Sequence, residues 1–307
     1  MSHGALETFD PSRLVAAGPH AISDALENGR IAYFPQCPVP LPDSDDLQLL
    51  REKLPGELKR KNVSYHPEAR QVRGLKKNAT LRPLAHDVLT RHSMAVTEFL
   101  ELVMPDLFAG ARIGTSSFRP IEERGRNLKP HASNELVHVD AGAYGATNGD
   151  RILRFFVNVN PELDRVWATK GSFPNVFSRY GEQAQLHEMI RRTGGLSKGP
   201  ADRARSALLR GLGRLGVPLA TVLDSSPYDR VMRRFHNFMK DTPAFQSSAV
   251  GHQEIRFPPF SAWMVFTDGV SHACLSGQHA FIWTCLIPLE NCRHPDLAPF
   301  NILEKAA

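Results

Sequence analysis

The sequence is poor in cysteine and has no long apolar run. Its four cysteines form no C-x-x-C pair, so neither a zinc knuckle nor a disulfide framework is expected. The longest apolar stretches, such as Ala280–Leu289, are much shorter than the roughly 20 residues that a membrane-spanning helix needs. Residues 1–11 are polar and include Glu7 and Asp10, which does not resemble a signal peptide. We therefore expect a reduced, cytoplasmic protein.

Internal repeats, low-complexity segments and regular βαβ alternation are also lacking. Hydrophobic residues make up 42% of the 307 residues and charged residues 22%, which excludes wholesale disorder and allows a sizeable core. We expect one domain over residues 1–307. The net charge of +5 hints at an anionic partner, but basic residues without interleaved aromatics do not favour nucleic-acid binding.

What the sequence does contain is a change from helical to strand-like patterns near residue 110, so residues 1–110 are expected to be the helical part. Residues 19–28, 45–54 and 84–104 have helical spacing, and a strand is expected at Ile31–Phe34. Strand-like runs follow at residues 111–119, 136–140, 151–160, 166–169, 253–257, 262–267, 270–275 and 280–289. This pattern favours an α+β, mainly β fold: a jelly roll, or double-stranded β-helix, with flanking helices.

A helical, basic insertion is expected at about residues 176–245, between the two strand-rich blocks. Within it, residues 191–223 carry one acid, Asp202, among the basic residues Arg191, Arg192, Lys198, Arg203, Arg205, Arg210 and Arg214. Two glycine motifs, Gly195-x-Ser197-x-Gly199 and Gly211-x-Gly213-x-x-Gly216, match a nucleophile elbow and a dinucleotide fingerprint. Neither follows a predicted strand, as both motifs require, so we interpret both matches as chance.

Four histidines are followed two residues later by an acid. The pairs are His66/Glu68, His138/Asp140, His252/Glu254 and His294/Asp296. Two of the pairs enclose a proline, which does not suit a central strand. The pair His138/Asp140 ends an apolar run, and residues i and i+2 of a strand point to the same side. This pair is therefore typical of one edge of a 2-His-1-carboxylate site for Fe(II).

A third ligand must come from elsewhere in the sequence. We favour His272, because it stands near the head of a strand, just after a hydrophobic strand turns at Asp268-Gly269. The competitor is His236, which lies in a helical and very basic context. The residues alone leave open the alternative that His138 and His272 are ordinary core histidines.

Arginine and tryptophan residues on the predicted strands are candidates for binding a ligand. Strand alternation places Arg154 on the same face as Phe156. A buried arginine there needs a carboxylate, either from a 2-oxo acid or from an internal salt bridge. Arg119, Arg165 and Trp167 are further inward-pointing candidates that would suit an acidic or sugar-like substrate, although each could equally be a surface charge or a packing aromatic.

With these residues in view, the chain resembles the Fe(II)/2-oxoglutarate dioxygenases. The broad resemblance rests on Gly29-Arg-Ile-Ala-Tyr-Phe, on His138-x-Asp140, and on the pair of strands from Trp263 to His272. More narrowly, the chain resembles the bacterial Kdo hydroxylases, which act on 3-deoxy-D-manno-octulosonic acid (Kdo). The segments that carry this narrower likeness are Arg119, His138-Val-Asp-Ala-Gly, Arg154-Phe-Phe-Val-Asn and Arg165-Val-Trp.

The resemblance implies an enzyme that hydroxylates Kdo at carbon 3, in the lipopolysaccharide inner core or in Kdo-lipid A. It implies Fe(II) on His138, Asp140 and His272, with 2-oxoglutarate as cosubstrate, O2 as oxidant and ascorbate as a candidate reductant. One departure is that residues 281–283, on the last strand, include no cation. Arg154 is therefore the candidate for holding the cosubstrate, with the sugar carboxylate as the alternative. The candidates for binding the sugar are Arg119, Arg165 and Trp167.

The same resemblance suggests a use for the basic insertion. Lipid A bears phosphates at the cytoplasmic face of the inner membrane, and Lys and Arg residues are attracted to such anionic surfaces. We expect a Kdo-containing lipid partner and peripheral contact with that membrane; a solvated loop and a homo-oligomer contact are the alternatives. Two other functions stay open: the same chemistry on another small molecule or a protein, and a non-catalytic jelly-roll module that binds an acidic glycan or lipid.

Overall fold

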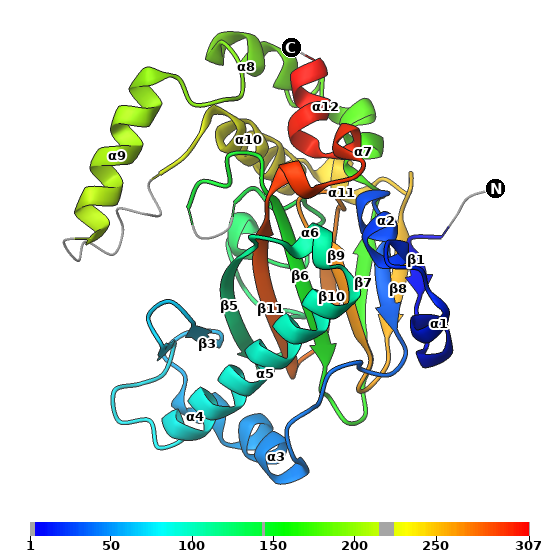
Figure 1. Ribbon diagram of the computed structural model, residues 1–307, viewed down its shortest axis with the longest axis vertical. Coiled ribbons are helices and arrows are strands. Elements are labelled where there is room, and N and C mark those ends of the chain that lie inside the picture. The colour runs from blue at the N-terminus through cyan, green and yellow to red at the C-terminus, as the bar shows by residue number, and fades with distance from the viewer. Residues whose placement is uncertain (1–3, 143–144, 215–223, 307) are drawn as a thin grey trace.

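The computed structural model describes residues 4–142, 145–214 and 224–306, which form a mixed α/β fold around a large sheet (Figure 1). The large sheet has the strand order β1-β2-β9-β6-β11-β5-β3-β4, and a second sheet has the order β10-β7-β8. The pair β1–β2 is parallel and the other neighbouring pairs are antiparallel. The strands are β1 Leu6–Thr8, β2 Ile31–Phe34, β3 Val63–His66, β4 Gln71–Arg73, β5 Arg112–Arg119, β6 Arg151–Asn158, β7 Arg165–Thr169, β8 Gln253–Phe257, β9 Ala262–Phe266, β10 Ala273–Ser276 and β11 Ala280–Ile287.

Helices pack on the outside of the sheets, and proline opens many of them, because its fixed φ suits the first helical position. The α-helices are α1 Pro11–Ala16, α2 Ala21–Glu27, α3 Ser44–Glu52, α4 Leu54–Glu57, α5 Arg82–Val103, α6 Pro105–Phe108, α7 Phe173–Tyr180, α8 Leu186–Thr193, α9 Pro200–Arg214, α10 Pro227–Asp241, α11 Pro243–Ser247 and α12 Pro299–Lys305. Three short 3-10 helices are η1 Pro130–Ala132, η2 Leu289–Asn291 and η3 Pro295–Leu297.

The core has a layer on each side of the large sheet. Helix α5 crosses one face (Figure 1), where it packs against side chains such as Phe155. The opposite face turns Phe156 and Trp263 toward Trp167 of the second sheet, with Phe156 and Trp263 stacked at 5.1 Å between ring centroids. Fully burying each such side chain contributes about 1.5–3 kcal/mol. Arg154 shares the face of Phe156, as the alternation along β6 predicts, and therefore points between the sheets.

Most predicted strands occupy their predicted residues to within one or two positions, as at β2, β6, β9 and β11. The predicted strand at residues 136–140 is wrong, because that segment forms only an isolated bridge between His138 and His272. Its other edge is bonded by side chains of α10 and α11 instead of a strand. The first part of the region expected to be a helical insertion forms two helices, α7 and α8, separated near Gln185, whose φ of 58° is left-handed.

Some elements were not predicted at all. The N-terminal 110 residues, expected to be helical, also contain β1, β3 and β4. These strands have three or four residues each, so they carry little alternation that a sequence pattern could reveal; β1 and β4 are the two edge strands of the large sheet, and β3 lies next to β4.

The residues described between β7 and β8 form helices α7 to α11 and no strand. The predicted insertion at about residues 176–245 falls within this region, and its status as an insertion stays a prediction. Figure 1 shows α9 projecting away from the sheets. Gly195 and Gly199 lie in the connection between α8 and α9, Gly211 and Gly213 lie in α9, and Gly216 lies outside the described residues. Among the described residues, no helix has the length and apolarity needed to cross a membrane.

Candidate metal centre

Three of the residues predicted to bind a metal lie together between the sheets. One ligand atom from each of His138, Asp140 and His272 lies within 4.8 Å of the others, and all three residues are largely shielded from solvent. Two backbone hydrogen bonds of 3.0 and 2.8 Å join His138 and His272 directly. In the part of the chain that the structure describes, no other group of three His, Cys, Asp or Glu residues is placed to hold a metal.

Both histidines present the same ring nitrogen to the centre. Nδ1 of His138 donates to the carbonyl of Leu136 at 2.7 Å, and Nδ1 of His272 donates to the carbonyl of Val270 at 3.0 Å. A neutral imidazole whose Nδ1 donates has a free lone pair on Nε2, the atom that binds a metal. Burial lowers the pKa of His138 to about 3 and also lowers the pKa of His272. Both rings are therefore in the neutral form that a metal requires.

His236, the competing third ligand, lies beside the centre but outside it. Its Nδ1 donates to the carbonyl of Val139 at 2.8 Å, and its ring stands edge-on to His138 with 4.9 Å between centroids. The structure therefore brings His272 to the centre and gives His236 a contact with the backbone between the two neighbouring ligands.

Asp140 completes the group. Its backbone N–H donates to the carbonyl of Thr267 at 2.8 Å, and its Oδ2 lies 2.8 Å from Nη2 of Arg154. Burial alone would raise the pKa of this carboxyl, but the Arg154 and His138 side chains hold it well below its usual range. Asp140 Oδ2 is buried and accepts no hydrogen bond of good geometry. Two neutral imidazoles and an ionised carboxylate with free lone pairs fit a divalent transition metal such as Fe(II).

The remaining predicted residues line a cavity next to the three ligands. The cavity has a volume of about 90 Å³, and its lining includes Arg119, Arg154, Arg165 and Trp167. Trp167 stacks on His272 with 5.3 Å between ring centroids. Buried N–H groups on all four side chains (the three arginine Nε atoms and Trp167 Nε1) have no hydrogen-bond partner in the described structure. Such a cavity offers several unused donors to an anion.

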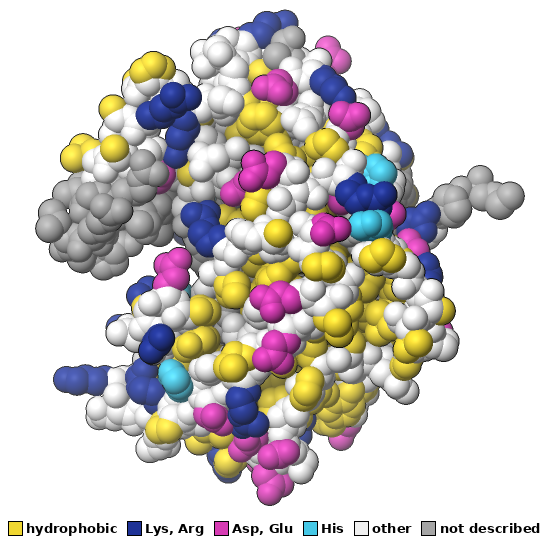
Figure 2. Space-filling model, in the orientation of Figure 1, with side chains coloured by type: hydrophobic (Ala, Val, Ile, Leu, Met, Phe, Trp, Pro, Cys, Tyr) yellow, Lys and Arg dark blue, Asp and Glu magenta, His cyan; other side chains and the backbone are white. Residues whose placement is uncertain are grey.

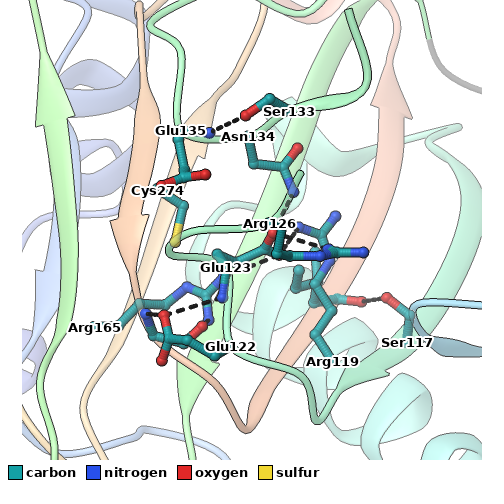
Figure 3. Close-up of polar contacts among 12 residues, drawn as sticks. Ser117, Arg119, Glu122, Glu123, Arg126, Ser133, Asn134, Glu135, Arg165 and Cys274 are labelled. Atoms are coloured by element: carbon teal, nitrogen blue, oxygen red, sulfur yellow. Dashed lines mark hydrogen bonds and ion pairs between the residues drawn. The ribbon is translucent and has the colours of Figure 1, made fainter. Parts of the chain in front are cut away.

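A buried carboxylate that the sequence reasoning missed stands among these arginines (Figure 3). Glu123 lies 3.3 Å from Arg119, 3.3 Å from Arg126 and 3.7 Å from Arg165, and it accepts a 3.0 Å hydrogen bond from Asn134. Burial alone would raise the Glu123 pKa, but Arg119 and Arg165 hold it below its usual value. The signal that could have found it is indirect, since two inward-pointing arginines need a buried anion.

Residues 133–140, which we call the ligand segment, are held on their other edge by helix side chains. Gln246 of α11 bonds both the N–H of Val137, at 3.0 Å, and its carbonyl, at 2.9 Å. Lys240 of α10 donates to the carbonyl of Ser133 at 2.8 Å. These side chains and His236 supply the bonds that a neighbouring strand would otherwise provide, and sequence reasoning assigned none of them this role.

Comparison with known proteins identifies close relatives of this arrangement. A sequence profile of the family described as 3-deoxy-D-manno-oct-2-ulosonic acid (Kdo) hydroxylase matches residues 14–307. The chain is similar to the solved structure of the Kdo hydroxylase KdoO, a non-heme Fe(II) alphaketoglutarate dependent dioxygenase, in complex with alphaketoglutarate and Fe(III). The two are 28% identical, with a TM-score of 0.79 and a match over 98% of this chain and 95% of that chain. The cobalt(II) complex of KdoO gives 28% identity and a TM-score of 0.80 over 99% and 96% of the two chains. No curated protein sequence matches the chain.

Proposed function

The chain belongs to the Kdo hydroxylase family, and from that membership we propose that it hydroxylates Kdo of the lipopolysaccharide inner core or Kdo-lipid A at carbon 3. It is an Fe(II)- and 2-oxoglutarate-dependent dioxygenase. The observation that supports the assignment of the active-site residues is that His138, Asp140 and His272 lie together beside a cavity lined by arginines.

We assign the three ligands to Fe(II), which when bound supplies the oxygen activation that converts 2-oxoglutarate to succinate and carbon dioxide as the sugar is hydroxylated. The chain's own residues prepare this site. The Nδ1 bonds of His138 and His272 fix both rings with Nε2 toward the centre. Arg154 keeps the Asp140 carboxylate ionised and oriented. Trp167 and Phe156 form apolar walls that exclude water from the reacting groups.

The cosubstrate is proposed to occupy the cavity beside the ligands, with Arg154 as its cationic partner. The cavity volume of about 90 Å³ is well below the roughly 300–1,000 Å³ of pockets for drug-sized ligands, so it suits a small dicarboxylate better than a sugar on a lipid. Arg119, Arg165 and Trp167, predicted to bind the sugar, line the same cavity. We therefore propose that they contact the cosubstrate and that the sugar enters from the cavity mouth.

Two finer assignments belong to the same proposal. The two sheets enclose a shared aromatic core, which supports the jelly-roll, or double-stranded β-helix, description of the fold.

Exposed basic and apolar side chains lie together on α9 (Figure 2), including Arg203, Arg205 and Leu208, the last with 65% of its surface exposed. This mixture supports peripheral contact of α9 with anionic lipid at the cytoplasmic membrane face.

The test of the metal assignment is an anaerobic titration of metal-free protein with Fe(II) and 2-oxoglutarate. We expect a weak visible charge-transfer band in the wild type that both His138→Ala and His272→Ala lose. A band that survives in His272→Ala but not in His138→Ala would point to His236 as the third ligand.

The test of the substrate is hydroxylation of Kdo-lipid A, followed by mass spectrometry as a gain of one oxygen. A wild type that forms the band but leaves Kdo unchanged would overturn the substrate assignment.

The α9 assignment has its own measurement. Arg203→Glu with Arg205→Glu should weaken binding to vesicles that contain phosphorylated lipid, because each cation near an anionic surface contributes about 1 kcal/mol. Neutral vesicles serve as the control. Unchanged binding to the anionic vesicles would remove the membrane contact and leave the hydroxylase assignment intact.

A further inference from the structure

Cationic side chains continue outward from the metal cavity along one path. The side chains of Arg165, Arg119 and Arg126 are 1%, 18% and 20% exposed, and all three contact Glu123 (Figure 3). Lys61 belongs to the same group by its position, because it stands two residues before Val63, which pairs with Phe118 of β5 next to Arg119. Burial and then the charge of Arg119 lower its pKa. The buried carboxylate thus has arginines on the cavity side and further cations toward solvent.

The two outermost cations, Arg126 and Lys61, have unused donors. Among the described residues, the Arg126 guanidinium makes one polar contact, 3.3 Å between Nη1 and Oε2 of Glu123, and a guanidinium has five N–H donors. The ammonium of Lys61 makes no hydrogen bond or ion pair with any residue that the structure describes. Neither residue lines the metal cavity itself. Arg126 nevertheless stands next to the cavity, because it contacts Glu123, which also contacts the lining residues Arg119 and Arg165.

The charges around the cavity are not balanced within the protein. Among the described residues, the cations are Lys61, Arg119, Arg126, Arg154, Arg165 and Lys240, and the carboxylates are Glu122, Glu123, Glu135 and Asp140. A divalent metal and a dianionic cosubstrate cancel one another, so the cationic excess stays after both have bound. A concave site with such an excess attracts a further anion.

The chemistry of the sugar places an anion next to the reacting carbon. In a 3-deoxy-2-ulosonic acid, carbon 1 is the carboxylate, carbon 2 is the anomeric carbon and carbon 3 is the methylene. Only carbon 2 separates the carboxylate from the carbon that is hydroxylated. A cation that binds this carboxylate must therefore stand at the rim of the metal cavity, whereas the phosphates of lipid A lie beyond the sugar and need no cation there.

Resting on the proposed function, we propose that Arg126 and Lys61 form an outer anion subsite that binds the carboxylate of the sugar acid. Glu123 is the fixed counter-ion of this arrangement. It orients Arg119 and Arg126 while occupying only part of their N–H donors. Its charge also neutralises the buried arginines, so the protein can fold before an anion is bound. Inner arginines then serve the small cosubstrate and outer cations serve the sugar.

The test compares steady-state kinetics of wild type, Arg126→Gln and Lys61→Met on Kdo-lipid A and on its Kdo carboxamide analogue. We expect each variant to raise KM for Kdo-lipid A about 10- to 100-fold, the effect of losing a charge-assisted hydrogen bond. KM for 2-oxoglutarate and the Fe(II)–2-oxoglutarate charge-transfer band should stay unchanged. The wild type should prefer the carboxylate over the carboxamide, and the variants should lose that preference. Arg60→Gln and Arg124→Gln, which remove exposed charges beside the subsite, are the matched controls and should behave as wild type.

The outcomes separate the subsite from the function on which it rests. If the wild type hydroxylates Kdo-lipid A and the variants match it, the subsite is wrong and the function stands. A rise in KM for 2-oxoglutarate would instead assign Arg126 and Lys61 to the cosubstrate. Equal losses on the carboxylate and the carboxamide would also overturn the subsite, because a site for the carboxylate must distinguish them. A wild type with no activity on Kdo-lipid A would remove the function and the subsite together.

Discussion

The two histidines of the metal centre are held by different parts of the fold. His272 lies between β9 and β10, in a segment whose backbone bonds to the residues that follow β7; the N–H of Ser271, for example, donates to the carbonyl of Gly171 at 3.0 Å. The turn that leads to it is fixed by an ion pair of 2.7 Å between Arg151 and Asp268, whose side chains are both 2% exposed. This half of the centre therefore depends on sheet packing and on one buried ion pair.

The ligand segment, which carries His138 and Asp140, is held in another way. One edge of it bonds to the chain around His272, but the other edge is bonded by the side chains of Gln246, His236 and Lys240. The comparison teaches that the two halves of one site can fail separately. Substitutions in the turn before His272 should mainly lower the free energy of unfolding of the whole protein. Substitutions in α10 and α11 should mainly displace the metal ligands His138 and Asp140 and so weaken metal binding.

The largest effect is expected from breaking the ion pair behind His272. Asp268→Ala should lower the free energy of unfolding by about 3–5 kcal/mol, because it leaves the Arg151 guanidinium buried without a carboxylate. Urea denaturation of the metal-free protein measures this loss. The double variant Arg151→Met with Asp268→Ala should recover much of it, since a buried ion pair can be replaced by apolar side chains at little cost. A single variant as stable as wild type would contradict this view of the turn.

A smaller but more selective effect is expected from the ligand segment. Gln246→Ala removes both hydrogen bonds to Val137, and we expect a loss of about 1–3 kcal/mol in unfolding free energy. Because the bonds orient the segment next to His138, Fe(II) affinity should fall about 10- to 100-fold, as it does when groups behind metal ligands are removed. Anaerobic calorimetric titration with Fe(II) measures this affinity.

The matched control is Gln48→Ala, the same change at an exposed position of α3, which should leave Fe(II) affinity unchanged. The proposed difference between the two halves would be contradicted if Gln246→Ala lowered stability without weakening Fe(II) binding. It would also be contradicted if Asp268→Ala, measured below its unfolding transition, weakened Fe(II) binding more than Gln246→Ala does.

The same contrast decides how much was predictable from the sequence. Alternation along β6 predicted both the strand and the inward direction of Arg154, because residues i and i+2 of a strand point to the same side and Arg154 therefore shares the inward face of Phe156. The helix side chains that bond to the outer edge of the ligand segment could not be predicted. Gln246 is 109 residues from Val137, and a single glutamine on a helix carries no periodic signal. Glu123 stands beside another glutamate in a polar loop, so only the fold shows which of the two is buried.

The last effect appears only as a change with pH and concerns the charge of Lys240, which pH isolates from the other contacts of the ligand segment. Burial lowers the pKa of Lys240 from 10.5 to about 8. As pH rises, the folded protein releases this proton before the unfolded chain does, so the free energy of unfolding should rise between about pH 8 and 10.5. The slope from this group is at most about 1.4 kcal/mol per pH unit. Lys240→Met should lose the rise while keeping the Gln246 bonds, and urea denaturation across this pH range measures the difference between the two profiles. Parallel profiles would show that folding does not lower the Lys240 pKa, so that the hydrogen bonds of its ammonium to the carbonyls of His131 and Ser133 offset the cost of burial.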